Sequence, residues 1–589
     1  MKNLFYPLSL LIGVLLVLFL QYSFQPYFFY IEQSQLFLWD SAYFLGHLSL
    51  PGGFSGWLSE SVIQYYSYPF VGALCTGLWV TTTALLAGNL LKRISGTSLM
   101  AMMGWIPALS LLLVAIDFNY LQAGNVAFLL CLLAASLYVR IPTFSYRLLA
   151  GILLLPLLAW WGSSVYMLFA VMAFLYEILL PQSSKQRLSS VSLLVVAALL
   201  ATCFYQSCMV DTWGKAISPS SYYISKLIPG KIIYASWVSL LLLVGLAGLV
   251  SRKEGMMTGK RRTIAWVVEL AFVLAFAYMG LMKFADKKSM RFMELDYYSR
   301  TGQWEKIEQA CQGKLTNYLY MSILSRALAE EGKLIDELFQ YDIRSERALA
   351  ISWNSTENVS VLLSDLYFTC GNTALAQRMA FEGDVSAHGA HNVRMIQRLV
   401  QTNLVFGAYP IAEKYITLLE KSPVYKKWAT PYRRFLNNDK LVEEDPLLGE
   451  KRALLFTPGD SNEVFISGGD FVQAVAEPLL ANPDKARTAF EYLAGFYLLS
   501  RDMSSFISFV NQFKETSLLS PMPRAVQEGI LIAYEGNPEK WEEYQLDDNI
   551  KSQFEEFRKQ VLSNRNNQGL PGLLHRSFGN TYWYYLMFK

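Results

Sequence analysis

Apolar residues form long, almost unbroken runs through the first half of the chain, and short polar stretches separate these runs. A hydrocarbon core about 30 Å thick needs about 20 apolar residues in helical conformation. Nine runs approach this length, at residues 4–22, 69–91, 99–116, 121–139, 147–161, 164–181, 190–208, 231–250 and 264–283. The fifth and sixth are short and nearly continuous, which predicts a tight helical hairpin or a re-entrant element there. We therefore expect about nine membrane spans, with eight as the alternative.

The second half of the chain has a different pattern, in which apolar and polar residues recur at helical spacing. Between residues 291 and 430, helical patterns end at glycines spaced 30, 39 and 36 residues apart, namely Gly302, Gly332, Gly371 and Gly407. Such helix pairs bury their apolar faces only by stacking on their neighbours. The sequence therefore predicts an all-α protein, a polytopic transmembrane bundle followed by an α-solenoid.

The first unit of this repeat resembles the tetratricopeptide pattern, in which a glycine lies between two helices and a small residue lies where they cross. The resemblance rests on Leu295–Tyr298, Gly302–Trp304, Ile307 and Ala310. We expect four regions: a transmembrane domain at 1–285, tetratricopeptide-like repeats at 286–435, an irregular linker at 436–470 and further helices at 471–589.

Composition agrees with this division. Of 589 residues, 53% are apolar and 16% are charged, whereas soluble chains contain about 25% charged residues. Residues 1–290 carry 18 Lys and Arg against 9 Asp and Glu, a net charge of +9, and residues 291–589 carry 32 against 38, a net charge of −6. An ordinary cytosolic protein and a disordered chain are both excluded.

The positions of Lys and Arg predict the orientation, because cytoplasmic loops retain them. Eleven basic residues fall in four alternate loops, whereas the segment 23–68 has none. This places the N-terminus in the cytoplasm and the second half outside, which is the periplasm if the membrane is a bacterial inner membrane. Four basic residues after the ninth run oppose this orientation: Lys283, Lys287, Lys288 and Arg291. Long domains cross largely regardless of charge, so we retain it.

The segment 23–68 is the most informative part of the chain, because about a third of it is aromatic and it contains the acids Glu32, Asp40 and Glu60. Aromatic residues favour the membrane–water boundary, so we expect short interfacial helices here. A carboxyl group among aromatic rings at this boundary is partly desolvated, which raises its pKa and makes it a usable base. The alternatives are that Asp40 caps a helix and that Glu60 is solvated.

A first span followed by an external acid, an aromatic loop and the sequence Tyr65-Tyr66-Ser67-Tyr68-Pro69 resembles the membrane module of GT-C glycosyltransferases. The resemblance covers about the first 280 residues. It implies a polyprenyl-phosphate sugar as donor and a catalytic base, with Glu32 as the first candidate and Asp40 as the second. The chain has Glu-Gln at positions 32 and 33 where many members have Asp-Glu, and it lacks the Trp-Trp-Asp motif of oligosaccharyltransferases. The whole chain also resembles an uncharacterised family of membrane proteins from Bacteroidota.

Two other predicted external loops carry candidate ligands. Asp117, with Asn119 and Asn125 nearby, offers oxygen atoms of the kind that Mg²⁺ or Mn²⁺ prefers, although a single carboxylate is more typical of an ordinary loop. Lysines can hold a phosphate as point charges, and the loop before the eighth run carries Lys215, Lys226 and Lys231. The alternative is that these lysines are surface residues.

The remaining motifs limit the possible functions. The chain has no Walker loop, no GxGxxG after a strand and no GxSxG elbow, and its second half is acidic, so nucleotide hydrolysis and nucleic-acid binding lack support. Two hypotheses remain. One is a GT-C-like glycosyltransferase whose external helical domain binds the acceptor or a partner. The other is a non-enzymatic, membrane-anchored scaffold that binds a protein partner through its tetratricopeptide-like domain.

Overall fold

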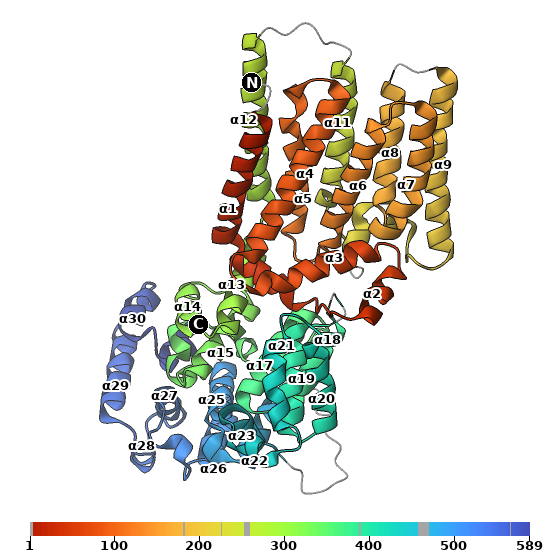
Figure 1. The fold of residues 1–589 in the computed structure, drawn as a ribbon. Helices are drawn as coiled ribbons and strands as arrows, with labels where there is room; N and C mark the ends of the chain where they lie inside the picture. The colour runs from red at the N-terminus through yellow and green to blue at the C-terminus, as the bar shows by residue number, and fades with distance from the viewer. Residues whose placement is uncertain are drawn as a thin grey trace. The chain divides into compact units, whose positions relative to one another are not determined.

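The computed structural model describes residues 4–180, 183–224, 227–251, 259–387, 389, 391–456, 471–565 and 567–589. In these residues every regular element is a helix, apart from one isolated β-bridge between Tyr120 and Tyr223. The chain divides into two compact units (Figure 1), residues 1–291 with 421–424, and residues 292–420 with 425–589. The predicted all-α fold, a helical bundle followed by a helical domain, is confirmed.

The first unit is a bundle of long apolar helices. Within the described residues, eight helices are long and apolar enough to cross a membrane, so the unit is that of a multi-pass membrane protein. The main helices are α1 (Phe5–Gln33), α4 (Val71–Ser95), α5 (Trp105–Ala115, preceded by short 3₁₀ turns), α6 (Ala123–Arg140), α7 (Phe144–Gly162), α8 (Val165–Leu179), α9 (Ser184–Gln206), α11 (Ala235–Ser251) and α12 (Gly259–Phe284). Helix α8, with 15 residues, is also apolar but shorter than these eight, so the described residues give eight candidate spans and one shorter apolar helix.

Helix α1 is longer than the sequence pattern predicts. It continues past the first apolar run to Gln33, through Pro26, for 29 residues. Its last turns are stabilised by burial, because the rings of Tyr27, Phe28 and Tyr30 all pack into the unit. Glu32 therefore lies in the last turn of the first long helix, and the expectation that it belongs to a loop is wrong.

Two short helices follow α1. Helices α2 (Ser41–Leu48) and α3 (Gly53–Ile63) lie at the end of the bundle where α1 ends (Figure 1). Gly52 has a φ of 80° at the turn between them, a conformation that glycine adopts without strain. The expected short helices of this segment are present.

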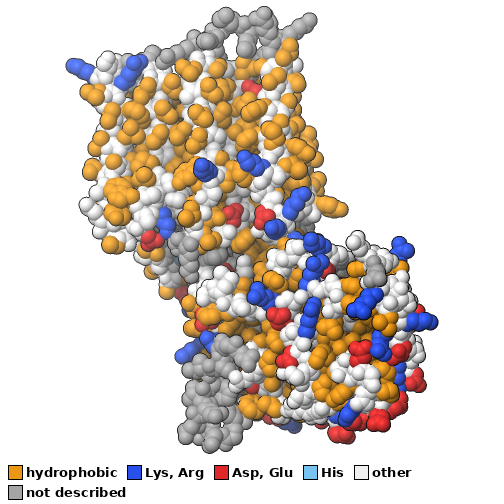
Figure 2. Space-filling model, turned by 180° about the vertical axis from the view of Figure 1, so that it is seen from behind, with side chains coloured by type: hydrophobic (Ala, Val, Ile, Leu, Met, Phe, Trp, Pro, Cys, Tyr) orange, Lys and Arg blue, Asp and Glu red, His pale blue; other side chains and the backbone are white. Residues whose placement is uncertain are grey.

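Small residues bring the helices of the bundle close together. A Cβ atom added at Gly104 would meet the Gly88 nitrogen and, at 2.6 Å, the Ala84 carbonyl oxygen of α4. The outward faces of the long helices are apolar, and Figure 2 shows hydrophobic side chains covering one face of this unit. This combination is typical of helices that pack on each other and face lipid.

The second unit begins with consecutive pairs of helices. They are α13 (Lys287–Arg300) with α14 (Trp304–Ala310), α15 (Tyr318–Glu330) with α16 (Leu334–Glu337), α17 (Glu357–Cys370) with α18 (Thr373–Val385), and α19 (Val393–Val405) with α20 (Tyr409–Glu420). The glycine between the two helices of each pair has a positive φ, at Gly302, Gly332, Gly371 and Gly407. The four turns are therefore where the sequence pattern predicts them.

The segment predicted as an irregular linker contains two helices among its described residues, α22 (Asp439–Glu444) and α23 (Pro446–Ala453). Both have capped starts: the Asn438 side chain accepts from Leu441 N–H, and the Asp445 side chain accepts from Leu448 N–H. Acidic and asparagine-rich stretches thus act here as helix caps. The rest of the predicted linker, residues 457–470, lies outside the described residues.

The unit ends with further helices: α21 (Lys426–Ala429), α24 (Phe471–Ala481), α25 (Arg487–Ser500), α26 (Met503–Gln512), α27 (Arg524–Ala533), α28 (Pro538–Glu543), α29 (Asp548–Ser563), α30 (Leu570–Phe578) and α31 (Tyr582–Phe588). The aromatic C-terminal segment packs inside this unit, where Tyr582, Trp583 and Tyr585 are almost fully buried. It is part of the core of the unit.

Candidate functional sites

Glu32, the first candidate base, is fully buried at the end of α1. The same end of α1 packs against the loop that carries Asp117, because the Tyr30 ring lies edge-on to Phe118 with 5.6 Å between centroids. The two acidic positions therefore belong to neighbouring segments. A base must reach the hydroxyl that it deprotonates, and a fully buried Glu32 has no open path to a substrate in this conformation.

Asp117, the candidate metal ligand, is held by neutral polar groups. The Tyr223 hydroxyl donates to its Oδ2 at 2.7 Å, and the Asn119 side chain donates to its Oδ1 at 2.9 Å. These contacts join the loop after α5 to the segment before α11. No group of three or more His, Cys, Asp or Glu side chains suited to a metal ion occurs in the described part of the chain. A metal role for Asp117 stays a prediction.

Asp40, the second candidate base, caps α2. Its Oδ1 accepts the Ala42 N–H at 2.9 Å, and its Oδ2 accepts from Lys421 Nζ at 2.6 Å, a residue of the 421–424 segment of this unit. The hydrogen bond from Lys421, followed by that from Ala42, holds the pKa of Asp40 below its ordinary value. A lowered pKa weakens a carboxylate as a base, so the helix-capping alternative describes what this side chain does here.

Asp40 also lies at the rim of a hollow walled by aromatic rings. The hollow has a volume of about 270 Å³ and is lined by Phe37, Leu38, Trp39, Asp40, Ser41, Phe44 and Trp57. The Trp57 ring packs on Phe44 at 4.9 Å between centroids. Neither Glu32 nor Asp117 is among the described residues that line this hollow.

A cluster that the sequence analysis did not recognise joins α2 to α3. His47 Nε2 lies 3.0 Å from Glu60 Oε2, and the Tyr43 hydroxyl donates to the same oxygen. The hydrogen bond to Glu60 is the largest effect on His47 and raises its pKa. Glu60 is thus paired rather than solvated. The signal was the spacing of Tyr43 and His47, four residues apart on one helix face.

Two of the three candidate phosphate-binding lysines, Lys215 and Lys231, belong to the described residues. Lys215 on α10 (Trp213–Ile217) donates to the neighbouring Asp211 carboxylate at 2.8 Å. Lys231 is exposed at the start of the 3₁₀ helix Lys231–Tyr234. Lys226 lies outside the described residues. A phosphate role for these lysines stays a prediction.

A buried acid near the end of α8 is paired with an arginine. Glu177 on α8 is fully buried and forms an ion pair with Arg147 on α7, and the Tyr138 hydroxyl donates to it at 2.8 Å. A buried charge is tolerated when it is paired and hydrogen-bonded. Glu177 therefore joins three helices, α6, α7 and α8, and has a structural explanation.

The second unit contains a larger cavity, of about 540 Å³, which the sequence analysis did not predict. Ligand pockets typically measure about 300–1,000 Å³. We call it the α17–α18–α25 pocket; its walls also include residues just before α17 and the start of α24. It is lined by Glu346, Arg347, Ala350, Ile351, Ser352, Trp353, Leu363, Tyr367, Leu375, Arg378, Met379, Phe471, Ala474 and Phe496.

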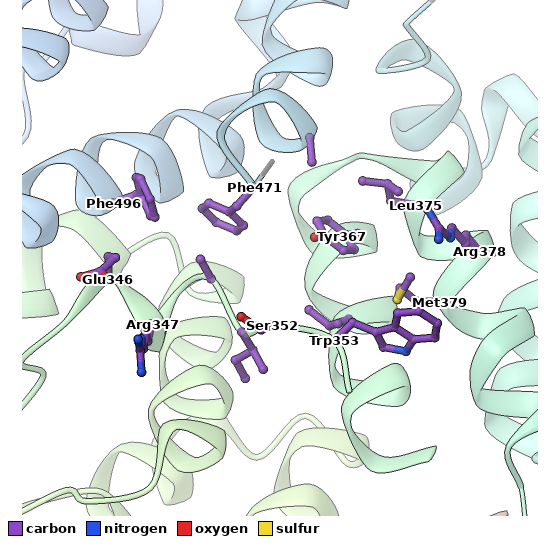
Figure 3. Close-up of a pocket in the computed structure, with 14 residues that line it drawn as sticks. Glu346, Arg347, Ser352, Trp353, Tyr367, Leu375, Arg378, Met379, Phe471 and Phe496 are labelled. Atoms are coloured by element: carbon purple, nitrogen blue, oxygen red, sulfur yellow. The ribbon is translucent and has the colours of Figure 1, made fainter. Parts of the chain in front are cut away.

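Aromatic and charged side chains alternate around this pocket. In Figure 3 the rings of Tyr367 and Phe471 lie between the Glu346 side and the Arg378 side. Burial raises the pKa of the Tyr367 hydroxyl to about 12, so this group stays protonated and can donate a hydrogen bond near neutral pH. The pocket therefore combines stacking surfaces, a neutral donor and charges.

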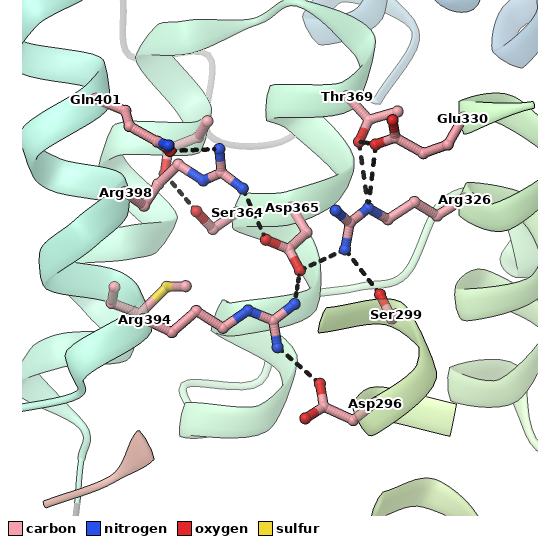
Figure 4. Close-up of polar contacts among 12 residues, drawn as sticks. Asp296, Ser299, Arg326, Glu330, Ser364, Asp365, Thr369, Arg394, Arg398 and Gln401 are labelled. Carbon is pink, nitrogen blue, oxygen red and sulfur yellow. Dashed lines mark hydrogen bonds and ion pairs between the residues drawn. The ribbon is translucent and has the colours of Figure 1, made fainter. Parts of the chain in front are cut away.

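A second charged cluster in this unit is balanced internally. Asp365 on α17 accepts from Arg326 on α15 at 2.6 Å and from Arg398 on α19 at 3.0 Å, and it also pairs with Arg394 (Figure 4). Arg394 pairs in addition with Asp296 on α13 at 2.7 Å. Burial raises the pKa of the Asp365 carboxyl, but the three guanidinium charges outweigh it and hold the pKa well below its usual range. This network joins four helices and explains their stacking.

Sequence reasoning missed the α17–α18–α25 pocket because its walls come from segments up to 150 residues apart in the chain, as from Glu346 to Phe496. The spacing of residues within one segment of the sequence cannot predict a site of this kind. The one signal in the sequence was Trp353, a large aromatic residue that lies in a polar stretch before a helix.

A family model described as "Family of unknown function (DUF6057)" matches residues 1–589, the whole chain. Neither the search of curated proteins nor the search of solved structures found a match. The match is consistent with the resemblance of the whole chain to an uncharacterised family, and it carries no activity. Because the match covers every residue, the chain belongs to the family of unknown function DUF6057.

Proposed function

We propose that this protein is a membrane-anchored binding protein. Its apolar bundle holds the second unit at the membrane, and the α17–α18–α25 pocket of that unit receives a ligand. The single observation that carries the proposal is the pocket of about 540 Å³ walled by aromatic side chains and lined by two arginines. Aromatic residues and arginine are the types that contribute most to binding at protein surfaces.

The location follows from the distribution of charge. We place the bundle in a bacterial inner membrane with the N-terminus in the cytoplasm and the second unit in the periplasm, as the basic loops favour. The repeated helix pairs of the second unit support a scaffold of tetratricopeptide-like kind, since stacked pairs present long surfaces to other proteins. A protein or peptide is therefore the expected type of partner.

Photo-crosslinking in living cells tests this proposal. A benzoylphenylalanine residue replaces Ser352, which is exposed and lines the pocket, and in a control it replaces the equally exposed Ser563 on α29. We expect a defined adduct from position 352 only, and its loss when Arg347 and Arg378 are both changed to Gln. The proposal would be contradicted if both positions gave the same amount of adduct, or if the adduct at position 352 still formed after both arginines were changed.

The aromatic hollow beside Asp40 favours a second candidate, a GT-C-like glycosyltransferase. Sugar rings stack their C–H faces on aromatic rings, and carboxylates accept hydrogen bonds from sugar hydroxyls. In this candidate function the donor is a polyprenyl-phosphate sugar, a divalent cation takes part through Asp117, and Asp40 contacts the sugar. Glu32 takes the role of base only if α1 rearranges, because its side chain is fully buried.

The second candidate is tested by measuring sugar transfer from a polyprenyl-phosphate donor by membranes that contain each variant. Asp40→Asn and Glu32→Gln should each lower transfer at least tenfold, whereas Asp211→Asn should not, since Asp211 is exposed and its ion-pair partner among the described residues is Lys215. If both variants transfer as the wild type does, catalysis by these acids is ruled out.

A further inference from the structure

The arginines of the α17–α18–α25 pocket differ from the other arginines that pack within the second unit. Arg326, Arg394 and Arg398 share carboxylates, and Arg452 pairs with Asp439 at 2.8 Å. Through their guanidinium groups, Arg347 and Arg378 have neither an ion pair nor a hydrogen bond to any described residue. Two cationic groups thus remain available at the wall of one cavity.

The charge of the lining favours a singly charged anion. Among the described lining residues Glu346 is the one carboxylate, so with the two guanidinium groups these residues carry a net charge of +1. A phosphate or diphosphate carries more negative charge than this lining offers and would meet the Glu346 carboxylate. A carboxylate matches the charge and accepts two parallel hydrogen bonds from one guanidinium group.

The remaining walls favour an aromatic body. Trp353, Phe471 and Phe496 supply rings, and the Phe471 and Phe496 rings lie 5.3 Å apart between centroids. The Arg378 guanidinium lies 6.0 Å from the centre of the Trp353 ring, so a cationic group and a stacking surface occur at the same wall. The Tyr367 hydroxyl has no hydrogen-bond partner among the described residues.

We propose that the α17–α18–α25 pocket binds a monocarboxylate whose body is an aromatic ring, with Arg378 on the carboxylate, Trp353 and Phe471 on the ring, and Arg347 adding positive charge from the Glu346 side. A peptide that ends in an aromatic residue has this chemistry, and so does a free aromatic acid. This inference rests on the proposed binding function and names its ligand class.

Fluorine NMR of the probe, with the full-length protein in lipid nanodiscs, tests the inference. The peptide-like probe is N-acetyl-4-fluorophenylalanine, its uncharged match is the corresponding amide, and the free-acid probe is 4-fluorophenylacetate, each used up to about 5 mM. We expect the acid form of the peptide-like probe to bind about tenfold more tightly than the amide, as the loss of a charge-assisted hydrogen bond implies.

Variants locate the binding and control for folding. Arg347→Gln with Arg378→Gln should abolish the preference for acid over amide, and Tyr367→Phe should weaken binding severalfold. Arg576→Gln on α30, an exposed arginine outside the pocket, should leave both affinities unchanged. Helical circular dichroism and melting that match the wild type confirm that each variant is folded.

The outcomes separate the ligand class from the binding function. Preferential binding of the N-acetyl probe identifies a peptide end, and preferential binding of 4-fluorophenylacetate identifies a free acid; either supports the inference. Equal binding of acid and amide, or binding that survives the double arginine change, overturns it. If no probe binds while the arginine-dependent crosslink at position 352 forms, the ligand class is wrong and the binding function stands. If both fail, both are wrong.

Discussion

At the scale of single residues, paired carboxylates in the second unit are of two kinds, buried and exposed. Asp365 is almost fully buried and forms ion pairs with three guanidinium groups, those of Arg326, Arg394 and Arg398. Removing one partner of such a network leaves uncompensated charge inside the protein, which costs far more than losing an exposed pair. The carboxylates at the surface of the same unit lack this role.

Asp365→Asn should therefore destabilise the second unit by about 3–5 kcal/mol. Glu413→Gln is the matched control, because it removes a carboxylate that is 57% exposed and pairs with Arg433, a kind of pair worth about 0–1 kcal/mol. Hydrogen exchange of α15, α17 and α19 at increasing denaturant concentrations measures the loss of stability in both variants. Similar losses in the two variants would show that the buried network does not stabilise the unit.

Glu528 on α27 predicts a pH dependence. Its carboxylate accepts from the Tyr582 N–H at the start of α31, and burial raises its pKa from 4.5 to about 7. Since the pKa in the folded state is higher, its contribution to stability is complete below about pH 4.5 and is lost as the pH rises through 7. The shift corresponds to at most about 3 kcal/mol.

We expect hydrogen-exchange protection of α31, corrected for the intrinsic rate, to fall between pH 5 and pH 8 in the wild type. Glu528→Gln should flatten this dependence, while Glu539→Gln, at an exposed position, should keep it. A wild type whose α31 is equally protected at both pH values would refute the role assigned to this buried carboxyl group.

At the scale of helices, the packing of the bundle depends on glycines that face backbone. The Gly104 and Gly88 backbones lie so close that a methyl group at Gly104 would meet main-chain atoms of α4, which cannot rotate away. Small residues at such crossings are what lets membrane helices approach each other.

Gly104→Ala should lower the yield of monodisperse protein and its melting temperature, with a cost of about 1–3 kcal/mol or more from overpacking. Gly245→Ala on α11 should behave as the wild type, because, apart from the nearby backbone of its own helix, no atom of a described residue lies within 4 Å of a Cβ added there. Size-exclusion chromatography and thermal unfolding in detergent compare the two. If Gly104→Ala left the yield and the melting temperature unchanged, α4 and the turn before α5 would have to pack less closely than the structure shows.

The helices themselves follow from local sequence, and their mutual contacts do not. Long apolar runs predict the membrane helices, and a glycine that needs a positive φ predicts each turn at Gly302, Gly332, Gly371 and Gly407. The end of α1 was missed because aromatic burial, rather than the apolar run, extends the helix to Gln33. The helices α22 and α23 were missed because capping residues resemble a loop when read in isolation.

The candidate sites can also be divided into features that depend on local sequence and features that depend on contacts between helices. Asp40 was singled out as a candidate base, and the alternative that it caps a helix is the one that agrees with its contact to the Ala42 N–H, a contact between neighbouring residues. The partners of Glu60 and the lining of the α17–α18–α25 pocket depend on which helices meet, so sequence spacing alone could not reveal them. This is why the acids of the first segment drew attention, and the arginines of the second unit did not.

At the scale of the whole molecule, we propose that the two units have different roles: the bundle anchors the protein in the membrane and the second unit binds a ligand. The bundle supplies apolar length and close helix packing, and its acids are buried, capping or paired, as Glu32, Asp40 and Glu177 show. The second unit supplies the cavity with available cationic groups. In the proposed binding function the ligand depends on Arg347 and Arg378, whereas the proposed glycosyl transfer depends on Asp40 and Glu32.

The most direct measurement compares these two sets of residues in the source organism. Strains that lack the gene receive the wild type, the Arg347→Gln/Arg378→Gln protein or the Asp40→Asn/Glu32→Gln protein at equal abundance, and the envelope proteome of each is quantified. The account predicts that the arginine variant reproduces the proteome of the deletion strain and that the acid variant reproduces the wild type. The reverse pattern would contradict it, because the acids of the membrane unit would then carry the function.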